Sequence, residues 1–114
     1  MTAGRRALGA RGEDLAARWY EAHGYTVVER NWRCRDGELD LVLVHGRTLV
    51  FSEVKTRSST AYGTPAEAVT RTKQLRIRRL GMRWIEAHDV RPASIRFDVA
   101  CVIGNAVEVI EAAF

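Results

Sequence analysis

With 114 residues, the chain is long enough to bury one core and too short for two ordinary domains, so we predict a single domain over residues 1–114. No run of about 18 apolar residues and no apolar signal-peptide block is present, which excludes a transmembrane helix and leads us to expect a soluble, cytoplasmic protein. The formal net charge of +4 and the isoelectric point near 9.6 favour an anionic partner.

The first predicted element is a helix over residues 5–23, which Gly24 can end in a left-handed cap. Its apolar stripe recurs at helical spacing and consists of Leu8, Gly12, Leu15, Ala16, Trp19 and Tyr20. Glu13 falls about 100° from the middle of this stripe, at a border from which a side chain can reach a site beside a sheet. Glu13 is therefore a candidate site carboxylate, and an ordinary boundary glutamate is an equally good interpretation.

Three strands are predicted next, in an antiparallel meander. Residues 25–30 are rich in β-formers, and the pair Asp36-Gly37 is a strong hairpin turn. The segments 37–42 and 51–55 then face each other across a second turn, whose two-residue loop is Gly46-Arg47.

This second hairpin is the most informative part of the chain. A two-residue loop at Gly46-Arg47 places Asp40 opposite Glu53 and Glu38 opposite Lys55, on one face of the sheet. Two ionised carboxylates about 5 Å apart repel by roughly 3 kcal/mol at an effective dielectric constant of about 20. A divalent cation would turn that repulsion into a binding site. These charges can also be explained as the wet side of a hairpin, but both faces of the strands are apolar, which favours a site.

A second helix is predicted from Pro65 to His88, because Thr64-Pro65-Ala66-Glu67 combines a capping box with proline at the first helical position. Its inner stripe contains Val69, Ile77, Leu80 and Trp84. Lys73 lies on the same stripe, where it either extends past the core, the interpretation we favour, or directs its ammonium toward phosphates.

The same segment is strongly basic. Between residues 68 and 85 there is no acid, and the cations are Arg71, Lys73, Arg76, Arg78, Arg79 and Arg83. A solvated helix surface normally mixes charges of both signs, so we favour nucleic acid as the partner of this face.

A buried strand over 95–103 follows, and Gly104-Asn105 turns it into a last strand over 106–110. We interpret Asp98 as a structural or supporting acid and not as a metal ligand. Nucleotide-binding glycine loops and the serine-hydrolase elbow are absent, the three histidines have no ligand spacing, and the two cysteines form no C-x-x-C pair. An all-oxygen site favours Mg²⁺ or Mn²⁺.

The predicted order of elements, with Asp40 followed after twelve residues by Glu53-Val54-Lys55, resembles the PD-(D/E)XK nuclease superfamily. Within it the chain resembles most the YraN family of uncharacterised bacterial proteins, and the next nearest relatives look like archaeal Holliday-junction resolvases. The segments that carry this resemblance are Gly12-Glu13, Arg30-Asn31, 37–42, 50–57, Lys73-Gln74 and 96–99.

The resemblance implies an α/β, restriction-endonuclease-like fold of three layers, in which a helix, an antiparallel meander and a second helix lead into further strands of a mixed sheet. It also implies a metal held by Asp40, Glu53 and the Val54 carbonyl, with Glu13 binding directly or through water. Lys55 would orient or activate the attacking water and stabilise the charged transition state. Asp40, Glu53 and Lys55 are thus the expected catalytic residues.

Two functions follow from this resemblance. The first is a Mg²⁺- or Mn²⁺-dependent endonuclease of DNA, with branched or junction structures among its candidate substrates, acting as a homodimer. The second is a noncatalytic nucleic-acid-binding or adaptor module with a vestigial site. For both we expect nucleic-acid contacts from Arg57, Arg71, Lys73, Gln74, Arg76 and Arg79.

Overall fold

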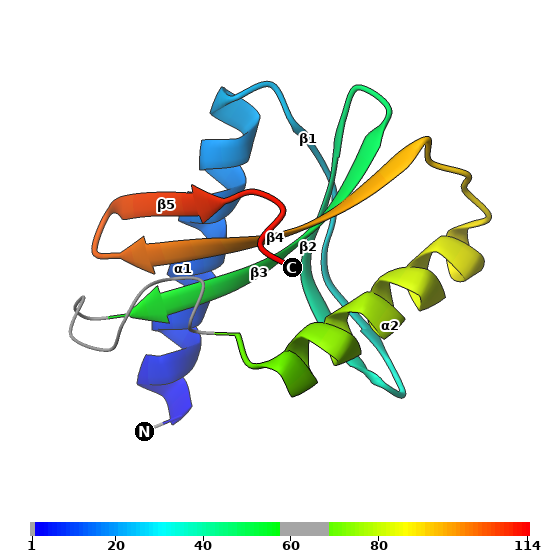
Figure 1. Cartoon of the computed structure of the whole chain (residues 1–114). Helices are drawn as coiled ribbons and strands as arrows, with labels where there is room; N and C mark the ends of the chain where they lie inside the picture. The colour runs from blue at the N-terminus through cyan, green and yellow to red at the C-terminus, as the bar shows by residue number, and fades with distance from the viewer. Residues whose placement is uncertain (1, 58–68) are drawn as a thin grey trace.

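The structure, a computed structural model, describes residues 2–57 and 69–114. Two helices and five strands follow one another in the order α1 (Thr2–Ala22), β1 (Thr26–Cys34), β2 (Gly37–His45), β3 (Thr48–Arg57), α2 (Arg71–His88), β4 (Ser94–Ile103) and β5 (Ala106–Ile110) (Figure 1). Within the described part of the chain, neither helix combines the length and apolar character needed to cross a bilayer.

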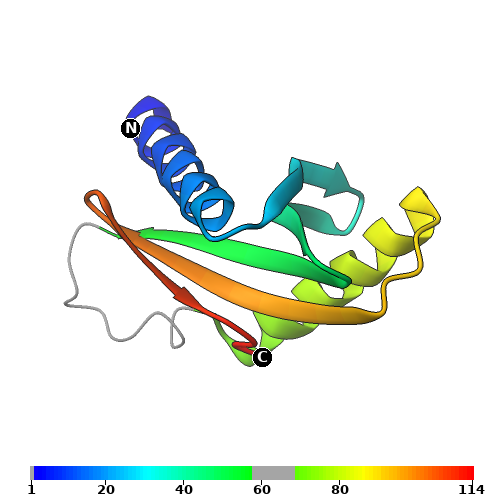
Figure 2. The same ribbon diagram turned by 90° about the horizontal axis from the view of Figure 1, so that it is seen from above.

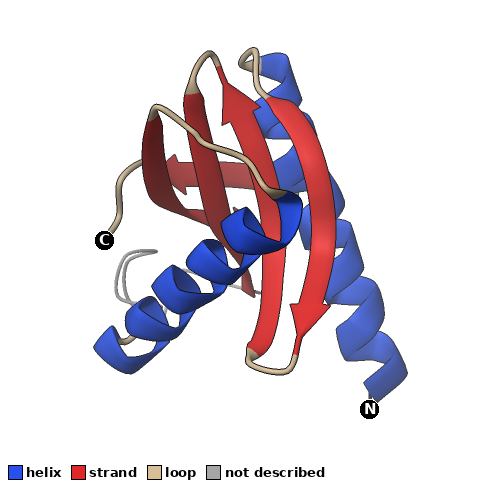
Figure 3. Ribbon diagram, turned by 90° about the vertical axis from the view of Figure 1, so that its right-hand side faces the viewer, coloured by secondary structure: helices blue, strands red, loops and turns tan. Residues whose placement is uncertain are grey.

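The strands form one mixed sheet in the order β1-β2-β3-β4-β5. Every neighbouring pair is antiparallel except β3 and β4, which are parallel. Parallel neighbours need a long crossover, and α2 lies within that crossover. The helices cover opposite faces of the sheet (Figure 3). The predicted α/β fold, with its meander, three layers and mixed sheet, is confirmed.

Each face of the sheet has its own core. On the α2 face, Phe51 packs with Leu80 and Trp84, and all three are buried. A Cβ added to Gly81 would lie 3.0 Å from the Phe51 ring, so glycine lets α2 approach the sheet closely. On the α1 face, fully buried Tyr20 packs among residues that include Leu43. Covered on both faces, the central strands can hold charged groups only where these are paired.

The predicted boundaries of the first helix hold to within a few residues, and those of the second do not. Gly24, at φ +89°, follows α1 in the left-handed conformation expected of it. The predicted start of the second helix at Pro65 is wrong, because α2 begins at Arg71. Thr70 caps it by accepting a hydrogen bond from the backbone N–H of Lys73 at 3.2 Å. The capping box over 64–67 lies outside the described residues.

The two hairpin turns position the rest of the sheet. The Gly46-Arg47 loop is confirmed, closed by the pair His45–Thr48. The β1–β2 turn lies one residue earlier than predicted, at Arg35-Asp36, and Gly37 is already the first residue of β2.

Beyond the middle of the sheet, β2 separates from β3. Their ladder runs from His45–Thr48 only as far as Leu41–Ser52, in the predicted register. In contrast, β1 and β2 stay paired to Cys34–Gly37, and β3 and β4 stay paired to Arg57–Ile103. The end of the β1–β2 hairpin therefore leaves the plane of β3 and β4 (Figure 2). We call the place where β2 leaves β3, just beyond Leu41–Ser52, the fork.

Candidate functional site

The carboxyl groups of Asp40 and Glu53 meet at the fork. Each is the first residue of its strand beyond the Leu41–Ser52 pair, and their side chains are within hydrogen-bonding contact. The backbone N–H of Val54 donates to Asp40 Oδ2 at 2.8 Å and fixes the orientation of that carboxyl group. The juxtaposition predicted from the hairpin register is thus present, held by a main-chain donor that the sequence did not indicate.

The crowding of these acids changes the protonation of Asp40. Burial, followed by the hydrogen bond and the negative charge of Glu53, raises the pKa of Asp40 to about 8, although the Val54 N–H acts in the opposite direction. The Glu53 side chain is itself only 8% exposed. Close contact between a buried and a half-buried carboxyl group, with a raised pKa at Asp40, is typical of a functional site.

Two lysines neutralise part of this charge. Lys73 Nζ lies 3.1 Å from Glu53 Oε2, so the lysine of α2 does not simply extend past the core. It also contacts Lys55. Burial and then the neighbouring Lys73 ammonium lower the pKa of Lys55. Burial lowers the pKa of Lys73 as well, but its contacts with Lys55 and Glu53 outweigh this effect and raise it overall.

Two further acids approach Asp40, Glu13 from α1 and Glu38 from β2 itself. Single carboxylate oxygens of Glu13, Glu38 and Asp40 all lie within 4.8 Å of one another. Burial raises the pKa of Glu13, opposed by Asn31 and Arg30. Glu13 therefore reaches the group of acids from α1. This position favours its interpretation as a candidate site carboxylate over that of an ordinary boundary glutamate.

Glu38 belongs to this acidic group without the partner predicted for it. Its expected pairing with Lys55 lies beyond the end of the β2–β3 ladder. Instead, Nε of Arg33 on the neighbouring strand β1 donates a hydrogen bond to Glu38 Oε2 at 2.8 Å. The sequence indicated that Glu38 shares a face with Asp40. It did not indicate that the fork would bring Glu38 toward Glu13 of α1.

Asn31 is a site residue that the sequence analysis missed. It lies within β1 at φ +54°, and its side chain hydrogen-bonds Glu13. Asparagine tolerates this left-handed conformation better than most residues, which was the available signal. The backbone geometry thus aims an amide at one of the acids.

The residues predicted to contact nucleic acid occupy several different environments. Arg71, Arg76 and Arg79 are exposed on α2. The Gln74 amide instead donates to the Val69 carbonyl at 3.1 Å. Arg57, at the end of β3, is half-buried, and its Nε has no hydrogen-bond acceptor among the described residues.

Asp98 lies on the other face of the sheet. It pairs with Ser52 in the parallel register, whereas Glu53 pairs with Val99, and adjacent strand residues point to opposite faces. Asp98 is fully buried, receives two 2.8 Å hydrogen bonds from Arg96 and is bonded by the Tyr20 hydroxyl at 2.9 Å. Its structural role, expected from the sequence, is supported.

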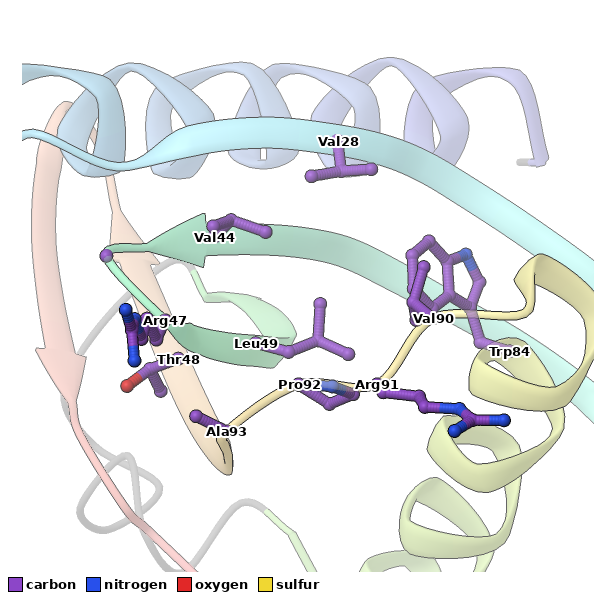
Figure 4. Close-up of a pocket in the computed structure, with 11 residues that line it drawn as sticks. Val28, Val44, Arg47, Thr48, Leu49, Trp84, Val90, Arg91, Pro92 and Ala93 are labelled. Carbon is purple, nitrogen blue, oxygen red and sulfur yellow. The ribbon is translucent and has the colours of Figure 1, made fainter.

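An apolar cavity of about 530 Å³ lies away from these acids. It opens beside the β2–β3 turn and the end of α2, where Leu49, Trp84 and Val90 line it (Figure 4). Arg47 and Arg91 are also among its lining residues, and no carboxylate is. The candidate site is therefore the open fork and not this cavity.

Known proteins resemble the chain over most of its length. The model of a family described as "Uncharacterised protein family UPF0102" matches residues 12–102, a range that contains every candidate site residue. A UPF0102 protein of Beutenbergia cavernae is 61% identical over 97 residues, covering 85% of this chain and 82% of the relative. UPF0102 proteins of Frankia alni and Nocardia farcinica are 56% identical over 96 residues and 54% identical over 99. These matches cover 84% and 87% of this chain, and 80% and 78% of the respective relatives.

Proposed function

The chain belongs to the uncharacterised protein family UPF0102, which is the YraN family, and we propose that it is a Mg²⁺- or Mn²⁺-dependent endonuclease that hydrolyses phosphodiester bonds of DNA. The observation that carries this proposal is the contact of the Asp40 and Glu53 carboxyl groups at the fork, with Lys55 and Lys73 beside them. Such a cluster is costly to bury and is arranged like a site for a cation and a phosphate.

The donor set fits a hard divalent cation. Asp40 and Glu53 offer carboxylate oxygens, and the nearest acids, Glu13 and Glu38, add more of the same kind. Oxygen ligands of this type suit Mg²⁺ and Mn²⁺. In the proposal Asp40, Glu53 and the Val54 carbonyl hold the ion, with Glu13 binding directly or through water. A bound ion would lower the pKa of its water and offset charge on the scissile phosphate.

Lys55 has the position of a group that acts on the reaction itself. It is half-buried and lies two residues beyond Glu53 on β3. Burial and the nearby Lys73 ammonium lower the pKa of Lys55, which makes it easier for the Lys55 amine to release and regain a proton. We assign Lys55 to orienting the attacking water and to donating toward the phosphate oxygens as negative charge develops.

A noncatalytic nucleic-acid-binding or adaptor module is the alternative function. The exposed arginines Arg71, Arg76 and Arg79 favour it, because they would contact phosphates whether or not the acids at the fork are active. The two functions differ only in whether the bound backbone is cut.

Cleavage of linear and branched DNA, assayed with Mg²⁺ or Mn²⁺, separates these functions. We expect Glu53→Gln to abolish cleavage, since the amide keeps the shape but removes the charge that ligates the ion. Lys55→Ala should lower the turnover number by about 10²- to 10³-fold with little change in DNA affinity.

The matched control is Glu108→Gln, which makes the same change at an exposed position on β5 and should leave cleavage unaltered. Circular dichroism checks that every variant is folded. A wild-type protein that cuts none of these substrates with either ion, or a Glu53→Gln protein that cuts as well as wild type, refutes the endonuclease function and leaves the binding module.

A further inference from the structure

Two exposed arginines lie at the β1–β2 turn, outside the basic segment of α2. Arg35 is one of the two turn residues, and the side chain of Arg33, at the end of β1, is 79% exposed. The turn projects from the sheet beside α2 (Figures 1 and 2). Trp32 and Cys34 pack toward α2, so Arg33 between them points to the other face, and Arg35 is the turn arginine that extends the positive charge of the helix.

Specific contacts hold this turn against the helix. Arg83 Nε of α2 lies 3.2 Å from Asp36 Oδ2 of the turn. The backbone at Gly37 approaches α2 so closely that an added Cβ would lie 3.3 Å from Leu80 Cδ1 and 3.7 Å from Arg76 Cδ. The turn and the middle of α2 thus present their charges as one surface.

The basic residues of α2 divide between two flanks. At about 100° per residue, Arg76, Arg79 and Arg83 fall within an arc of about 60°. Arg83 pairs with Asp36 of the turn and Arg76 lies beside Gly37, the residue that follows the turn, so this arc is the flank that faces it. Arg78 belongs to the opposite flank, where its guanidinium lies 4.8 Å from the centre of the Phe97 ring.

The turn and its flank of α2 carry a clear excess of positive charge. We define the turn–helix surface by its four arginines, which are Arg35, Arg76, Arg79 and Arg83. Over residues 35–37 and this flank the acid is Asp36, so four positive charges meet one negative charge. Asp36 is already paired with Arg83.

We propose that the turn–helix surface binds the phosphodiester backbone of nucleic acid and guides it to the fork. Guanidinium groups bind phosphates through paired hydrogen bonds, and such contacts position a substrate without reading its sequence. Asp40 is three residues beyond Gly37 on β2, about 10 Å along the strand, so a backbone held at the turn passes close to the acids. This inference rests on the proposed function, because it assumes a nucleic-acid substrate at the fork.

The two hairpin turns allow a matched comparison. Arg35 and Arg47 are both exposed arginines in two-residue turns, at opposite ends of β2. We would measure binding of a short fluorescent DNA duplex by anisotropy at several salt concentrations, with a chelator present so that no cleavage occurs. Arg35→Ala should weaken binding about 3- to 10-fold and reduce the slope of log Kd against log salt by about 1. Arg47→Ala should leave both unchanged.

Each result bears on the surface separately from the chemistry. Equal effects of Arg35→Ala and Arg47→Ala, no effect of Arg35→Ala, or no binding by the wild type would overturn the turn–helix surface. Weakened binding by Arg35→Ala alone supports it, even if the wild-type protein cuts no DNA. Cleavage by the wild type together with equal binding by both arginine variants would refute this inference and leave the endonuclease standing.

Discussion

Lys73 is the present counter-charge of Glu53, at 3.1 Å, and in the proposed mechanism a cation takes its place beside that carboxylate. The two positive groups then compete for one carboxylate. A lysine displaced from Glu53 is free to contact a phosphate of the substrate, which agrees with the interpretation that directs the Lys73 ammonium toward phosphates.

We therefore predict opposite effects of Lys73→Met on metal and on substrate. The affinity for Mn²⁺ without DNA, measured by calorimetry, should rise by about 3- to 10-fold. The reason is that the variant loses the Lys73–Glu53 interaction, worth roughly 1 kcal/mol, with which the ion must compete. DNA affinity or cleavage should fall. Arg71→Met, on the first turn of the same helix, serves as the control and should not change Mn²⁺ affinity. Weaker Mn²⁺ binding by Lys73→Met would show that the lysine supports the ion site.

Asp40 makes the stability of the metal-free protein depend on pH. Its pKa, about 8 in the folded protein against an ordinary value of 3.8, means that the folded state holds this proton more tightly than the unfolded chain. The free energy of unfolding should consequently fall as the pH rises from about 4 to about 8.

Asp40→Asn removes the titrating group, and we predict that the variant gains stability relative to wild type as the pH rises. With a chelator present, the difference in Tm between variant and wild type should be clearly larger at pH 8 than at pH 5. The measurement is thermal unfolding by circular dichroism at the two pH values. A difference of equal size at both would mean that Asp40 is already ionised at pH 5.

At the scale of elements, signals between neighbouring residues predicted well. The Gly46-Arg47 turn fixed the register of the β2–β3 hairpin, and with it the contact of Asp40 and Glu53. The buried-strand pattern over 95–103 and the turn Gly104-Asn105 likewise identified β4 and β5. A strand pattern is a local property, so one sequence is enough to read it.

What the sequence could not predict depends on contacts between elements. The capping box at 64–67 indicated a helix start at Pro65, whereas Thr70 is the N-cap of α2. The β2–β3 ladder ends at Leu41–Ser52, the end of the β1–β2 hairpin packs beside α2, and Glu38 lies near Glu13. No spacing along the chain reports where two strands part or that Asn31 takes a positive φ.

For the molecule as a whole, the candidate site and a buried hydrogen-bond network lie in different parts of the sheet. The fork holds Glu53 and Lys73 on the α2 face and is reached by Glu13 from α1, while a separate buried network on the α1 face joins distant segments. Asp98 of β4 bonds Arg96, the Tyr20 hydroxyl of α1 and the backbone N–H of Ala112. Burial and the Asp98 charge raise the pKa of Tyr20, so its hydroxyl stays a proton donor. The network can secure the fold without constraining the chemistry of the fork.

We predict from this division that Asp98→Asn costs stability and spares the site. Removing one charge leaves the Arg96 guanidinium, only 20% exposed, without its buried partner, which should lower the free energy of unfolding by about 3 kcal/mol or more. Asp14→Asn is the matched control, because Asp14 also pairs with an arginine, Arg30, but at the surface, and it should cost less than about 1 kcal/mol. Urea denaturation measures both values. Calorimetric Mn²⁺ affinity of folded Asp98→Asn should match wild type, since Asp98 points away from Glu53 across the sheet. Equal stability losses in the two variants, or a weakened Mn²⁺ site in Asp98→Asn, would show that the faces are not independent.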